Sequence, residues 1–130
     1  MTRVFVSSCT IDSGHPSALV NKLLAEGFEV LHSPRIDQGV NWGDWYNRDL
    51  LNALDRTDIF IIAVTESWQF STWMQHEALE AQKRLQAGRI QRMFFYNPVN
   101  VEVTGEGMLP FLKERLPDDL EELALYLGRE

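Results

Sequence analysis

The residues in this sequence that are best suited to chemistry are an acid and an aromatic ring four positions apart. Trp73 and Glu77 lie in a segment whose pattern predicts a helix from Thr72 to Leu85, stopped by Gly88. Residues four apart share one helix face, so the indole and the carboxylate project together. The ring offers a stacking plane for a base, and the carboxylate can stabilise a cationic sugar centre. The alternative is ordinary: a glutamate here is commonly a solvated surface residue.

A second group of candidates lies at the end of the first apolar run, Val4-Phe5-Val6. Ser7, Ser8 and Thr10 follow it directly. A loop of hydroxyls that leads to a helix N-terminus can hold phosphate or ribose oxygens. Two further candidates for contact with substrate lie later in the chain: Arg35, which would supply positive charge, and Trp42, whose position in a predicted helix also favours packing.

The composition excludes several kinds of function. Among 130 residues, 12 are Lys or Arg and 19 are Asp or Glu, a net charge of -7, which disfavours nucleic-acid binding. One cysteine cannot form an internal disulfide, and three scattered histidines lack metal-ligand spacing. No stretch approaches the ~20 apolar residues of a membrane span, and the N-terminus lacks a signal peptide's apolar run. We expect a single cytoplasmic domain over 1–130, with no metal, no cofactor and no membrane partner.

Apolar runs and helical stripes alternate along the chain. Strands are predicted at 4–6, 28–31, 59–64 and 93–96, and Val99, Val101 and Val103 form either a fifth, edge strand or none. Between them, helices are predicted from Pro16 to before Gly27, along a stripe from Trp42 to Leu54, and from Thr72, and a terminal helix contains Leu120 to Leu127. This order predicts an α/β fold: a three-layer, open, mostly parallel sheet of four or five strands with helices on both faces. Ligands in such folds bind beyond the carboxyl ends of the strands.

The order of these motifs resembles a TIR (Toll/interleukin-1 receptor) domain. The resemblance covers roughly residues 3 to 96: Val4-Phe5-Val6-Ser7, Asp37 and Gly39 in a loop, Trp42 before a helix, the strand from Ile59, and Ser71-x-Trp73-x-x-x-Glu77. It implies the flavodoxin-like strand order 2-1-3-4-5. In the NAD-cleaving bacterial-type branch, the equivalent of Glu77 is the catalytic carboxylate, and the equivalents of Ser7, Ser8 and Thr10 contact substrate. Many active members have an aromatic and then basic residues after the first serine, where this chain has Ser8, Cys9 and Thr10.

The resemblance therefore implies an NAD glycohydrolase or ADP-ribosyl cyclase, with NAD as substrate. The nicotinamide of NAD is already a cationic leaving group, so cleavage needs stabilisation of the oxocarbenium-like ribosyl centre rather than a general acid. Catalytic members generally act when assembled, so we expect a homo-oligomer, or contact with other TIR domains, through the loop 33–40. In a bacterial chain the resemblance implies phage defence or virulence signalling.

Two rival functions stay open. A nucleoside deoxyribosyltransferase-like N-glycosidase would use Glu77 as a covalent nucleophile on a nucleoside. A non-catalytic TIR assembly module would use the loop 33–40 for signalling contacts, and its Glu77 would be incidental.

Overall fold

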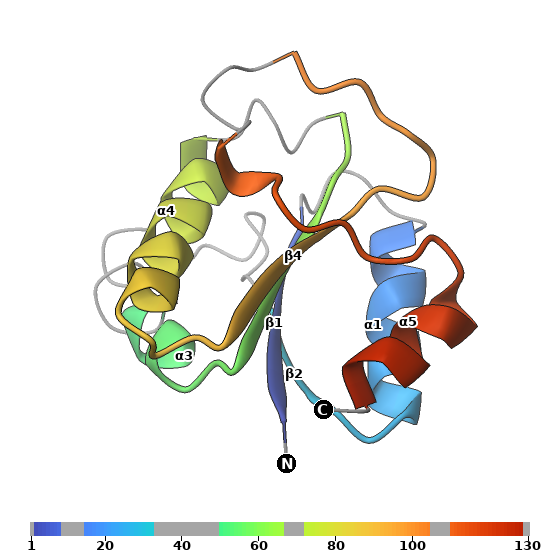
Figure 1. Ribbon diagram of the computed structural model, residues 1–130, viewed down its shortest axis with the longest axis horizontal. Coiled ribbons are helices and arrows are strands. Elements are labelled where there is room, and N and C mark those ends of the chain that lie inside the picture. Colours follow the sequence, from blue (N-terminus) through green and yellow to red (C-terminus); the bar gives the residue numbers. More distant parts are fainter. Residues whose placement is uncertain (1, 9–14, 33–49, 67–71, 105–109, 129–130) are drawn as a thin grey trace, which may run out of the picture.

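The computed structural model describes residues 2–8, 15–32, 50–66, 72–104 and 110–128. Strands and helices alternate within these ranges (Figure 1). In chain order the elements are β1 (Arg3–Ser7), α1 (His15–Ala25), β2 (Glu29–His32), α3 (Leu51–Asp55), β3 (Ile59–Ala63), α4 (Thr72–Gln86), β4 (Arg92–Tyr96) and α5 (Leu120–Gly128). The α/β class predicted from the sequence is confirmed.

The four strands form one parallel sheet in the order β2-β1-β3-β4. This is the predicted flavodoxin-like order for the first four strands. Residues 97–104 contain no strand, so the three spaced valines do not extend the sheet. Instead, Arg115 forms an isolated parallel bridge with Phe95 on the outer side of β4. Asn97 explains the irregular path, because its side-chain amide both donates to and accepts from the backbone of Val101.

Successive side chains along each strand point to opposite faces of the sheet, so the core is divided into two parts. Phe5, Phe60 and Ile62 pack on the side of α3 and α4, and Phe5 stacks on Phe60 with ring centroids 5.3 Å apart. Val4 and Val6 point to the opposite side, which α1 and α5 cover. Figure 1 shows this division, with α3 and α4 on one side of the sheet and α1 and α5 on the other. Strands covered on both faces are apolar at every position, which is why their runs are continuous in sequence.

The predicted helix ends are confirmed where the structure describes them. Gly27 and Gly88 both have positive φ, +90° and +77°, which is the left-handed conformation that ends a helix. The helix expected between Trp42 and Leu54 is described only in its last part, as α3, because residues 33–49 lie outside the described ranges. None of the described helices is both long enough and apolar enough to cross a bilayer.

Two contacts fix the segment between β4 and α5. Leu116 is buried with Leu123 and Leu127 of α5 against the β1 and β3 side chains. The hydroxyl of Tyr96, at the end of β4, donates to the carbonyl of Asp118 at 3.2 Å. The chain therefore returns across the sheet edge and brings α5 back beside α1, where Lys22 and Glu121 form an ion pair at 2.8 Å.

Candidate functional site

Ser7 is placed by the alternation of β1. It is two residues after Phe5, so its side chain points to the same face, which α4 covers. It is the last residue of a strand at the centre of the sheet, where the carboxyl ends of parallel strands open toward a ligand site. The result is a hydroxyl with no exposed surface directed at the helix above the strand end.

Glu77 is placed by the buried stripe of α4. Met74, Ala78 and Ala81 belong to the core on this side of the sheet. Glu77 follows Met74 by three positions and precedes Ala81 by four, so it shares their face of the helix. The acid therefore occupies a position that in an amphipathic helix is ordinarily apolar. Its exposed fraction is 0%.

The two side chains meet directly. The Ser7 hydroxyl donates to Oε1 of Glu77 at 3.0 Å, and Sδ of Met74 lies 3.4 Å from the same oxygen of Ser7. The hydroxyl carries one proton, and a carboxylate oxygen is a much stronger acceptor than a thioether. The serine therefore orients the acid, and the methionine packs against the pair.

Burial of an acid in an apolar core carries a large desolvation cost, because the ionised group loses its hydration. Glutamates are rarely fully buried without partners, so the surface-residue alternative for Glu77 is wrong. Acids held in this way occur often at sites of catalysis or binding. Further polar groups end the neighbouring strands: Thr65 is buried beyond β3, and Asn97 is buried beyond β4.

The structure brings together two of the seven residues predicted for the site, Ser7 and Glu77. Ser8 is half-buried directly after β1. Trp73 lies in the first turn of α4, and its side chain is outside what the structure describes. Thr10, Arg35, Trp42 and the loop 33–40 all lie outside the described residues.

Sequence reasoning missed the burial of Glu77. The signal was the spacing of Met74, Ala78 and Ala81, which places the acid in the apolar stripe. It also missed Met74 as a contact of Ser7. No signal in the sequence identified that contact, because it depends on how α4 crosses β1.

The structure also contains a pocket that lies away from the pair of Ser7 and Glu77. It has a volume of about 120 Å³ and is lined by α4, β4 and the segment from Pro110 to Glu114. Neither Ser7 nor Glu77 lines it, so this pocket is not the cavity expected beside Glu77. Among the described residues, no three His, Cys, Asp or Glu side chains form a group that could hold a metal ion.

A comparison with solved structures agrees with this architecture. No protein-family model matches the chain, and no curated protein matches it. The TIR domains in a structure of the activated Roq1 resistosome directly recognizing the pathogen effector XopQ superpose with a TM-score of 0.59 at 12% sequence identity. The match covers 85% of this chain and 68% of that chain. At this identity the likeness concerns the fold: the chain has the fold of a TIR domain.

Proposed function

We propose that this domain cleaves the bond between nicotinamide and ribose in NAD, with Glu77 as the carboxylate that stabilises the ribosyl centre. One observation carries the proposal: Glu77 is buried at the carboxyl edge of the central strands and is oriented by the Ser7 hydroxyl. A preorganised carboxylate shielded from water interacts more strongly with a developing cation than one in solvent. The TIR fold supports the proposal in general terms.

In the proposed reaction the C–N bond breaks and its electron pair stays on the nicotinamide nitrogen, which leaves as the neutral base. The ribosyl carbon gains positive charge, which Glu77 offsets. Water then adds to that carbon and releases a proton, giving ADP-ribose, or a ring nitrogen of the adenine in the same molecule adds instead of water and gives cyclic ADP-ribose. Ser7 is a positioning residue in this scheme, because it contacts Glu77.

Direct contact between Glu77 and ribose requires a rearrangement, because the side chain has no exposed surface. We propose that assembly supplies it, with the loop 33–40 of one copy completing the site of a neighbour. The structurally similar TIR domains belong to an activated resistosome, which supports this mode of action.

The test compares wild type with Glu77→Gln, at high protein concentration, by detecting nicotinamide together with ADP-ribose or cyclic ADP-ribose. Loss of one preorganised electrostatic group typically lowers kcat by about 10² to 10³, and we expect that loss here. Glu80→Gln is the matched control, since Glu80 lies on the same helix and pairs with Lys83 and Arg84 instead. Equal release by wild type and Glu77→Gln would remove Glu77 from the site.

A non-catalytic assembly module is the second candidate, and the complete burial of Glu77 favours it, because a structural acid needs no access to solvent. In that case no NAD is consumed, Glu77→Gln leaves signalling intact and substitutions in the loop 33–40 abolish it. Turnover of deoxynucleosides in place of NAD would instead indicate the deoxyribosyltransferase-like reaction.

A further inference from the structure

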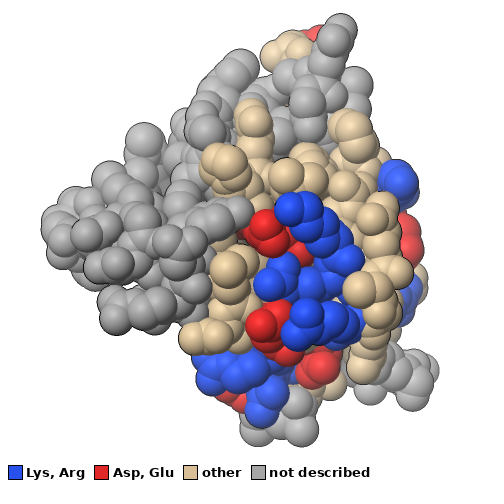
Figure 2. Space-filling model, turned by 90° about the vertical axis from the view of Figure 1, so that its left-hand side faces the viewer, with Lys and Arg blue, Asp and Glu red and all other residues tan. Residues whose placement is uncertain are grey.

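The outer face of α4 is basic in a chain that is acidic as a whole. From Ala81 to Tyr96 the sequence contains four cations and no carboxylate. Figure 2 shows Lys and Arg side chains gathered on this side of the molecule. The basic face, as we define it, consists of five of the chain's 12 cations: Arg56, Lys83, Arg84, Arg89 and Lys113. Arg92 is not part of it, because its guanidinium lies over the Tyr126 ring of α5 and donates to the Tyr126 hydroxyl.

Intramolecular ion pairs neutralise only part of this charge. Among the residues that the structure describes, two carboxylates pair with cations of the basic face: Asp55 with Arg84 and Arg89, and Glu80 with Lys83 and Arg84. A third carboxylate, Glu114, lines the pocket on this side and pairs with Arg92. Five cations against these three carboxylates leave an excess of positive charge. Lys83 and Arg89 keep 60% and 56% of their side-chain surface exposed, so they are available to a partner.

The basic face also contains an apolar depression. It is the pocket of about 120 Å³ between α4 and the segment before Arg115, with Leu85, Met93 and Phe111 among its lining residues. Lys113 lies at the same pocket. A partner that fits this surface needs an apolar side chain surrounded by negative charge.

The acidic end of the same chain has that pattern. Asp118, Asp119, Glu121 and Glu122 are four carboxylates within five residues, and all four are exposed. Leu125 follows Glu121 by four positions and Glu122 by three, so the three side chains share one face of α5. Leu125 is 57% exposed, so its apolar side chain is available to a partner.

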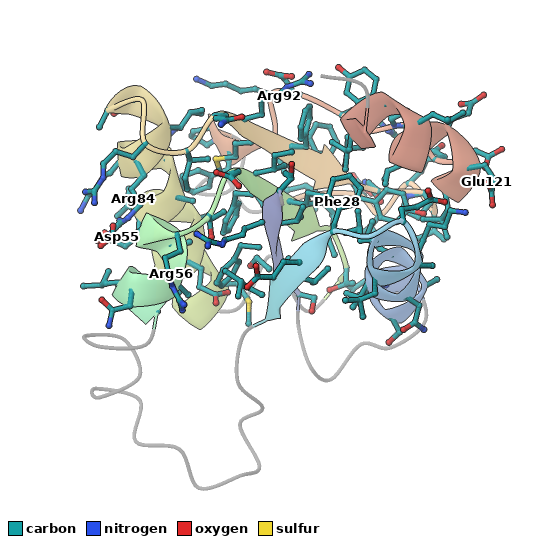
Figure 3. The ribbon with its side chains drawn as sticks, turned by 90° about the horizontal axis from the view of Figure 1, so that it is seen from below. Phe28, Asp55, Arg56, Arg84, Arg92 and Glu121 are labelled. Carbon is teal, nitrogen blue, oxygen red and sulfur yellow. The ribbon has the colours of Figure 1, made fainter. Side chains whose placement is uncertain are left out.

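These two surfaces cannot meet within one molecule. Figure 3 shows Asp55, Arg56 and Arg84 at the α3 and α4 side and Glu121 on α5 at the opposite side, with the sheet between them. A contact between one copy's basic face and another copy's α5 is heterologous, and it leaves one surface of each kind free on the growing complex.

We infer that the basic face binds the α5 face of a second copy of this chain, with Leu125 in the apolar pocket and Glu121 and Glu122 against Lys83, Arg89 and Lys113. The inference does not rest on the proposed glycosidase, because none of these residues contacts Ser7 or Glu77. The contact is a weak, salt-sensitive, head-to-tail association, since exposed ion pairs contribute little individually and are screened by salt.

Sedimentation velocity over a concentration series at two ionic strengths tests the association. At about 0.1 M salt the wild type forms species larger than a dimer as its concentration rises, and at about 1 M salt, where the Debye length is about 3 Å, it dissociates at the same concentrations. A wild type that stays monomeric at every concentration in low salt overturns the inference. So does a low-salt monomer that binds phosphatidylserine vesicles, because the basic face then serves an anionic surface.

Charge reversal tests which surfaces are in contact. Lys83→Glu with Arg89→Glu makes the α4 side acidic, and Glu121→Lys with Glu122→Lys makes the α5 side basic. Each double variant alone should be monomeric, because its two surfaces then carry like charge. A mixture of the two should associate again, since every contact in it pairs opposite charges. Both variants keep a net negative charge, so overall attraction does not explain that recovery. A mixture that stays monomeric, or a variant that associates as wild type does, overturns the inference.

Leu125→Ser tests the apolar part of the contact. It should weaken self-association about tenfold or more, as loss of a well-buried apolar anchor does. Val99→Ser is the matched control, because Val99 is also exposed, at 63%, but lies outside both surfaces. Equal association of the two serine variants would remove Leu125 from the contact.

Discussion

The contact between Ser7 and Glu77 combines an unfavourable burial of the acid with a favourable hydrogen bond to it. The acid occupies a core position, where an apolar residue would pack without any desolvation cost. The serine hydroxyl offsets part of that cost by donating to Oε1. A group kept at such a cost to stability is more easily explained by function than by folding, as trade-offs between stability and activity generally show.

Replacement of Ser7 tests whether it acts through Glu77. A hydrogen bond to a charged group contributes about 1.5 kcal/mol or more, so Ser7→Ala should lower kcat about tenfold and leave KM nearly unchanged. In the Glu77→Gln background the same substitution should have no further effect on kcat, because there is no carboxylate left to position. Steady-state kinetics of the four proteins in this double-mutant cycle measure both effects. Multiplicative losses would show that Ser7 acts independently of Glu77.

At the scale of the elements, the hydrogen bond of Tyr96 in the return of the chain from β4 to α5 makes the stability of the fold depend on pH. Tyr96 is buried and donates to the carbonyl of Asp118. Burial raises the pKa of the Tyr96 hydroxyl above its ordinary value of 10.0, and the nearby charges of Asp118 and Asp119 raise it further. The folded state therefore favours the neutral phenol. The stability that this preference contributes is complete below pH 10.0 and is lost as the pH rises through the folded-state pKa.

Tyr96→Phe should lower the free energy of unfolding by about 1 kcal/mol at neutral pH, since it removes one buried hydrogen bond. Above pH 10.0 the wild type loses stability more steeply than the variant, so the difference between them shrinks. Lys22, whose pKa the hydrogen bonds to Glu121 and Glu26 raise, titrates in both proteins and cancels in the comparison. Urea unfolding of both proteins across this range measures the difference. A difference that is constant or grows with pH would contradict the assignment to Tyr96.

The elements were largely predictable because their signals are local. The apolar runs at Val4 and Ile59 are strands covered on both faces, and Gly27 and Gly88 end helices at positive φ. The bridge of Arg115 to Phe95 was not predictable, because it pairs residues twenty positions apart, and the alternating valines between them form no strand. Of the site, the sequence identified Ser7 and Glu77, but their contact depends on how α4 packs across β1. The basic face was missed because Arg56 and Lys113 join the α4 cations only in the folded chain.

At the scale of the whole molecule, charge is separated between the two outer layers. One layer carries the basic face of α4, and the other carries the carboxylates that begin α5. Neither outer surface includes Ser7 or Glu77, which are buried between α4 and the sheet. Substitution of Ser7 or Glu77 should therefore alter the chemistry without altering this association.

The proposed dependence of activity on assembly gives a prediction at this scale. If a neighbouring copy completes the site, NAD cleavage per molecule should rise with protein concentration and then level off. Dilution assays of nicotinamide release at constant NAD measure this, with Glu77→Gln as the inactive reference. A rate per molecule that does not change with dilution would show that one copy has a complete site.

The bridge between Phe95 and Arg115 also limits how copies can join. Edge strands normally present unpaired backbone groups to which a foreign strand can add. Here the N–H of Phe95 donates to the carbonyl of Glu114 at 2.8 Å, and its own carbonyl accepts from the N–H of Leu116 at 2.9 Å. A second molecule therefore finds no free main-chain partner at Phe95. Sheet extension, the route toward amyloid-like stacking, is blocked at this point of the edge, so a neighbouring copy that touches it has to do so through side chains.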